Sequence, residues 1–124
     1  MNVDIQYVTD IMIKYLNIPS PSGKTAEALD EVKRQFEDMG IKTFRTKKGA
    51  VIATIEGENN EEHKTISAHI DTIGVMVKGI KPNGRLKVVR VAGGTWTALE
   101  GANVFVETRH GIKYRGTIMP VYAS

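Results

Sequence analysis

Cysteine is absent from this chain of 124 residues. Neither a disulfide framework nor a thiolate metal site can therefore form, and any metal must be held by nitrogen and oxygen ligands. Apolar runs of about 18 residues are also missing, and residues 1–10 lack the basic start and apolar core of a secretion signal. We therefore expect a cytoplasmic protein with no membrane partner.

Blocks of about five or six like charges do not occur either. The 17 Lys and Arg residues exceed the 14 Asp and Glu residues only slightly, and both kinds are spread along the chain. Nucleic-acid binding needs a basic stripe or a recognised reader motif, so no nucleic-acid partner is expected. Gly93-Gly94 lacks the lysine and spacing of a phosphate loop, and Ser20 and Ser22 lack the glycines of a nucleophile elbow.

What is present predicts two helices in the first third of the chain. Apolar residues recur there at steps of three and four, which is typical of helices with one buried face. The first helix should end by Ile18, because Pro19 disfavours helical geometry in the residue before it. Ser22 is the expected N-cap of the second helix, and Gly40 the left-handed residue after its end. The two apolar stripes are Ile5, Val8, Ile11, Met12, Tyr15 and Leu16, and then Leu29, Val32, Phe36 and Met39.

After Gly40 the pattern changes to extended segments. Residues 41–46 and 50–56 predict a hairpin, and residues 64–68 a short strand that ends at His69. From Val75 onward only strands and turns are expected. Those later strands are residues 75–80, 86–91, 103–108 and 112–121. The chain is therefore expected to be α/β over residues 1–74 and all-β over residues 75–124, with a domain boundary near Gly74.

His69 and Asp71 are the candidate functional residues. They are two positions apart at the end of an expected strand, and in an extended chain such residues point to the same side. Asp71 could accept a hydrogen bond from one ring nitrogen of His69 and leave the other nitrogen available to a metal. The alternative is a hydrogen-bonded core histidine beside an aspartate in a turn, and the triplet alone does not decide between the two. His63 and His110 are expected on the surface.

Three groups of residues, taken in order, carry a resemblance to a known family. They are Ile-Pro-Ser-Pro-Ser-Gly at 18–23, Ala-His-Ile-Asp-Thr-Ile-Gly at 68–74, and Pro-Asn-Gly-Arg-Leu at 82–86 followed by Gly93-Gly94. Together they closely resemble the start of the metallo-aminopeptidase family that includes tetrahedral, glutamyl and deblocking aminopeptidases, some of whose members are called endoglucanases. The similarity runs over essentially the whole chain. One departure is Thr72, where many members have glutamate.

The resemblance implies a role for each candidate residue and for each part of the chain. His69 matches the first metal ligand, and Asp71 matches the acidic catalytic residue that orients and polarises the site. Residues 1–74 would be the N-terminal part of a mixed-sheet zinc-peptidase catalytic domain. Residues 75–124 would be the opening strands of a β-barrel-like insertion that makes the protein a homo-oligomer. The complete enzyme would hold two divalent metal ions, either zinc, cobalt or manganese, and act on peptide substrates.

The other metal ligands and the glutamate general base of the family lie beyond residue 124. Even an open catalytic zinc site normally uses three protein ligands, and of these only His69 is expected here. We therefore expect an N-terminal fragment that binds no metal tightly and is inactive alone. Two alternatives remain open, a non-catalytic β-domain subunit and one half of a split enzyme.

Overall fold

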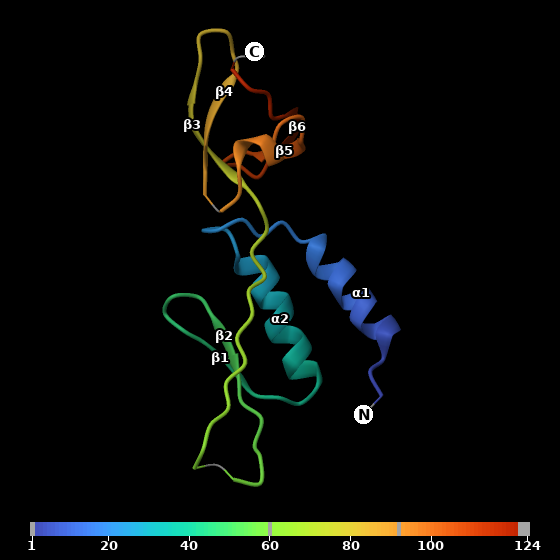
Figure 1. The fold of residues 1–124 in the computed structure, drawn as a ribbon. Helices are drawn as coiled ribbons and strands as arrows, with labels where there is room; N and C mark the ends of the chain where they lie inside the picture. The colour runs from blue at the N-terminus through green and yellow to red at the C-terminus, as the bar shows by residue number, and fades with distance from the viewer. Residues whose placement is uncertain (1, 60, 92, 122–124) are drawn as a thin grey trace. The chain divides into compact units, whose positions relative to one another are not determined.

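The computed structural model describes residues 2–59, 61–91 and 93–121. Two helices are followed by three antiparallel hairpins and one short 3-10 helix, which makes a small mixed α/β protein (Figure 1). The chain divides into two compact units, residues 1–92 and 93–124. This division differs from the boundary near Gly74 that separates the expected catalytic and barrel parts, and that boundary stays a prediction. None of the helices in the described part is long and apolar enough to cross a membrane.

Helix α1, Ile5–Leu16, begins and ends where local chemistry directs it. The Asp4 carboxylate accepts a hydrogen bond of 3.0 Å from the Tyr7 amide, which would otherwise have no partner at the helix start. The helix ends before Pro19, as predicted.

Helix α2, Ala26–Asp38, was predicted correctly at its end but not at its start. Thr25 occupies the N-cap position and makes no side-chain capping bond, so the prediction of Ser22 as N-cap was wrong. Gly40 has the predicted left-handed conformation, with φ of 77°. That conformation brings the Ile41 amide within 2.9 Å of the Phe36 carbonyl, which closes the helix end.

A polar network joins α1 to α2. The Tyr15 hydroxyl donates to Gln35 Oε1 over 2.6 Å, and the Lys14 ammonium group forms an ion pair with Glu31. Arg34 donates to both oxygens of the same carboxylate, at 2.7 and 3.0 Å. The hydrogen bonds from Arg34 and then Lys14 lower the pKa of Glu31 from 4.5 to about 2.

The lowered pKa of Glu31 predicts an acid-sensitive helix pair. A carboxylate whose pKa is lower in the folded state stabilises that state fully above the unfolded value and loses the effect as pH falls through the folded value. The ring NMR signals of Tyr15 should therefore shift toward unfolded positions between about pH 4.5 and pH 2, and Glu31→Gln should remove this pH dependence. Glu27→Gln is the control, since Glu27 makes no ion pair with a described residue. Equal shifts in wild type and Glu31→Gln would contradict the prediction.

The predicted hairpins form, although most strands are shorter than expected. Strands β1, Thr43–Arg45, and β2, Val51–Ala53, pair antiparallel, and Arg45 joins them to α2 through a 3.0 Å ion pair with Asp30. Strands β3, Val75–Ile80, and β4, Leu86–Arg90, form the next hairpin. The predicted strand at residues 64–68 was wrong, because no described strand pairs with this segment.

Both faces of the β3–β4 hairpin carry apolar side chains. A bulge between Val77 and Gly79 places Val77 and Ile80 on the same face of the hairpin. On that face Val77 pairs with Val88, and Ile80 pairs with Leu86. Met76 and Val89 pair on the other face. Ile80 is 75% exposed, and Met76 and Val77 are also exposed. Strands with apolar residues on both faces are typical of sheets that are covered on both sides.

The second unit contains the 3-10 helix η1, Trp96–Ala98, and a hairpin of β5, Asn103–Glu107, and β6, Lys113–Thr117. Leu99 is buried, and the Gly101 amide donates to the Ile118 carbonyl over 2.8 Å. No barrel closes within the described residues, where every sheet has two strands.

Candidate metal centre

The segment around His69 is anchored to the proline-rich turn that follows α1. Pro21 and Thr72 form an isolated parallel bridge. The Ser20 amide donates to the Thr72 hydroxyl over 2.9 Å, and the Thr72 amide donates to the Ser20 carbonyl over 2.9 Å. The Ser20 hydroxyl donates to the Ile70 carbonyl over 3.1 Å. We call this set of contacts among Ser20, Ile70 and Thr72 the Ser20 clamp.

His69 and Asp71 lie together as the sequence predicts. Nδ1 of His69 is 2.9 Å from Oδ1 of Asp71, and the His69 side chain is 88% exposed. A neutral imidazole that donates a hydrogen bond from its Nδ1–H group to a carboxylate keeps the lone pair of Nε2 available. This arrangement fits the way carboxylates orient metal-ligating histidines in proteins. The side chain of His69 does not belong to a core of this chain, whereas the alternative of a core histidine would require its burial.

The His69–Asp71 pair could supply only one ligand of a metal site, the imidazole of His69. Within residues 2–59, 61–91 and 93–121, no group of three His, Asp or Glu side chains could hold a metal ion. His63 and His110 are both exposed, as expected, one in a loop and the other in the β5–β6 turn. His69 is thus a candidate ligand, and the described residues supply no set of three side chains to which it could belong.

The sequence did not indicate that the hydroxyl groups of Ser22 and Thr72 lie near the His69–Asp71 pair. Ser22 Oγ lies 3.4 Å from Oδ2 of Asp71, a long contact that faces the oxygen not used by His69. Thr72, the departure from the family pattern, accepts the Ser20 amide. Both contacts join residues about fifty positions apart, so no local pattern could have predicted them.

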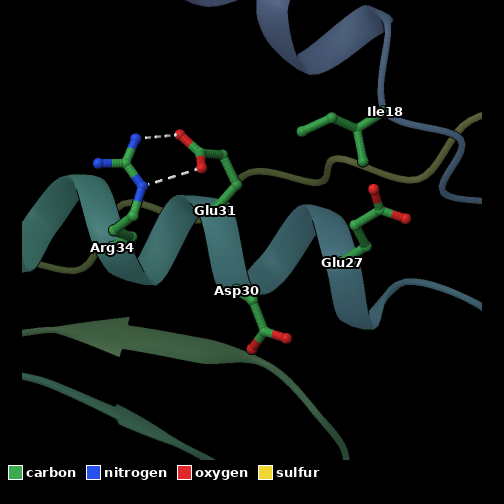
Figure 2. A pocket seen from close by; sticks show the side chains of 5 residues that line it. All are labelled: Ile18, Glu27, Asp30, Glu31 and Arg34. Carbon is green, nitrogen blue, oxygen red and sulfur yellow. Dashed lines mark hydrogen bonds and ion pairs between the residues drawn. The ribbon is translucent and has the colours of Figure 1, made fainter.

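A shallow depression lies on α2, and another is lined by residues 37 and 40–43 at the end of that helix. Figure 2 shows the lining residues of the first depression, Ile18, Glu27, Asp30, Glu31 and Arg34. Two of its three carboxylates already have partners, since Glu31 binds Arg34 and Asp30 binds Arg45. Glu31 also pairs with Lys14 of α1, and Asp30 joins α2 to the β1–β2 hairpin, so we assign both carboxylates a structural role.

A histidine oriented by a carboxylate, at the end of an extended segment and without cysteine nearby, is typical of metal-dependent hydrolases. The model of the family described as M42 glutamyl aminopeptidase matches residues 49–123. The chain is also 35% identical over 115 residues to "Putative aminopeptidase YhfE" of Bacillus subtilis (strain 168), a match that covers 93% of this chain. The chain belongs to the M42 glutamyl aminopeptidase family. It spans about one third of the relative, 33% of its length.

Proposed function

We propose that this chain is the N-terminal part of a cytoplasmic, co-catalytic metal-dependent aminopeptidase that removes N-terminal residues from peptides. His69 would be a metal ligand and Asp71 a catalytic residue. Family membership supports the proposal, and the 2.9 Å contact between His69 Nδ1 and Asp71 Oδ1 is the observation that carries it. In the complete enzyme we propose two divalent metal ions, zinc, cobalt or manganese.

Divalent ions in such sites polarise the peptide carbonyl and lower the pKa of water. The residues of this chain would set the orientation of the metal ligand. The Asp71 carboxylate holds the His69 proton on Nδ1 and orients the ring, so that Nε2 presents its lone pair in one direction. Without this partner the imidazole ring would be free to turn. Fixing the ring on metal binding would then make the free energy of binding less favourable.

We propose that the chain alone is inactive. It matches one third of the relative, and its described residues offer one candidate ligand where an open catalytic zinc site normally uses three. The other ligands and the general base would come from the remaining two thirds, either in the same polypeptide or as the second half of a split enzyme. The exposed apolar side chains on both faces of the β3–β4 hairpin favour the presence of a further segment that covers them. This agrees with the proposal that residues 75–124 are an incomplete oligomerisation insertion.

Two proteins test this function. One is the purified chain, and the other is a chimera in which the chain replaces the matching third of the Bacillus subtilis relative. With zinc, cobalt or manganese added, the chain should show no release of amino acids from peptides above background, because it lacks a ligand set. The chimera should restore turnover. The unaltered relative is the positive control.

Either of two results would contradict the proposal. A folded chimera that stays inactive beside an active relative would show that this chain does not supply the first third of an aminopeptidase. Turnover by the chain alone that disappears in His69→Ala would show that it assembles a complete site by itself.

A further inference from the structure

Ser20 has the most deeply buried polar side chain of the described residues, with 1% exposed. Buried polar groups need hydrogen-bond partners, and those of Ser20 lie on one short segment. Its hydroxyl binds the Ile70 carbonyl, its amide binds the Thr72 hydroxyl, and its carbonyl accepts the Thr72 amide. These partners flank Asp71 on both sides. The clamp therefore restrains the backbone before and after the carboxylate that orients His69.

Close packing supports the same contact two residues further on. A Cβ atom added to Gly74 would lie 2.4 Å from Cβ of Pro21, which is closer than real Cβ atoms approach. Glycine thus allows the turn and the 70–74 segment to lie against one another. The Ser20 clamp and the contact between Pro21 and Gly74 hold the two segments together at consecutive residues of the turn, Ser20 and Pro21.

We infer that Ser20 and Thr72 are positioning residues for the His69–Asp71 pair. They hold the backbone of Asp71 so that its Oδ1 stays in reach of His69 Nδ1, and the histidine then keeps the tautomer with a free Nε2. The inference deepens the proposed function, on which it rests for the meaning of a free Nε2. The hydrogen bonds of the Ser20 clamp run among Ser20, Ile70 and Thr72 and do not include the His69 ring. Ser20 and Thr72 both act through Asp71.

The tautomer of His69 is the readout that a merely structural role would not change. Nitrogen-15 NMR of the 124-residue chain at about pH 9, well above an ordinary histidine pKa of about 6.5, reports which ring nitrogen carries the proton. We expect the Nδ1–H form in wild type. Thr72→Val removes the hydroxyl at nearly constant shape and should shift the population toward Nε2–H. Thr72→Ser, which keeps the hydroxyl, should restore the wild-type signal.

Amide exchange gives a second readout on the same samples. The Thr72 amide is bonded to the Ser20 carbonyl, and its protection should fall roughly five- to tenfold in Thr72→Val, the range expected when one hydrogen bond is lost from a linked pair. Thr65→Val is the matched control. Thr65 is exposed and makes no hydrogen bond with a described residue, so it should change neither readout.

Ser20→Ala is the second test variant and decides the matter if Thr72→Val does not fold. It removes only the hydroxyl that binds the Ile70 carbonyl, and Ser67→Ala serves as its exposed control. An unchanged His69 tautomer in both test variants, or an equal change in a control, would overturn the inference. These readouts need neither metal nor substrate. An inactive chimera would therefore refute the proposed function while leaving the clamp intact, and an unchanged tautomer would do the reverse.

Discussion

His69→Ala in the chimera is expected to lower kcat/KM by more than about 100-fold, beyond the roughly 10- to 100-fold loss that follows removal of a partner that only orients a ligand. Alanine removes the nitrogen that would bind the metal, and no group of three potential ligands occurs among the described residues to compensate. Metal content of the purified variant should fall together with activity.

Asp71→Asn separates the two roles within the pair. The amide keeps the shape of the carboxylate but not its charge, so the His69 ring stays a ligand while its orientation weakens. We expect a loss of about ten- to hundredfold with metal content largely kept. His63→Ala is the control, since His63 is an exposed loop histidine six positions upstream. Full activity in His69→Ala would contradict its assignment as a ligand. An unaffected rate in Asp71→Asn would make Asp71 an ordinary turn residue.

Self-association of the isolated chain is the second large effect that we expect. Within the described residues every sheet has two strands, so no third strand pairs with the outer edges of a hairpin, and such edges recruit other edges. The β3–β4 hairpin adds apolar side chains on both faces, including Ile80, which is 75% exposed. Lysine and arginine side chains on the same strands oppose stacking only in part. The mass in solution should therefore rise above that of the 13.7 kDa chain as concentration increases.

Sedimentation velocity over a tenfold concentration range measures this association. Ile80→Lys places a charge on the exposed face beside Leu86 and should shift the distribution toward monomer. Ile80→Val keeps the apolar surface and should leave it unchanged. A single 13.7 kDa species of wild type at every concentration would show that the strands close on themselves, and would favour a free-standing β-domain.

The sequence predicted those parts of the fold that depend on near neighbours. Proline at position 19 and glycine at position 40 set the helix ends through their own backbone preferences, and both predictions held. The turn glycines placed the hairpins correctly. The strand at residues 64–68 failed because a strand needs a partner, and alternating apolar residues do not show whether one is present. Ile66 in this segment is 98% exposed.

The candidate site shows the same limit. Proximity of His69 and Asp71 follows from their spacing of two in an extended segment, and the structure confirms it. Ser22 was read as a helix cap because serine before a helical stretch usually caps it. Its hydroxyl instead lies near Asp71, 49 positions away, and the N-cap residue of the helix, Thr25, makes no side-chain capping bond. Hydroxyl side chains have no periodic pattern, so their distant partners are invisible before the fold is known.

The Ser20 clamp joins residues 52 positions apart, and we expect contacts of such separation to form late in folding. Helix α2 and the β1–β2 hairpin lie between its two ends and can form from local contacts first. Closing a loop becomes harder only with the logarithm of its length, and doubling the length costs about 0.6 kcal/mol. The exposed segments at residues 57–59 and 61–63 could therefore lengthen in related chains with little penalty. The histidine and its carboxylate would stay aligned while the polypeptide between the two ends of the clamp diverged.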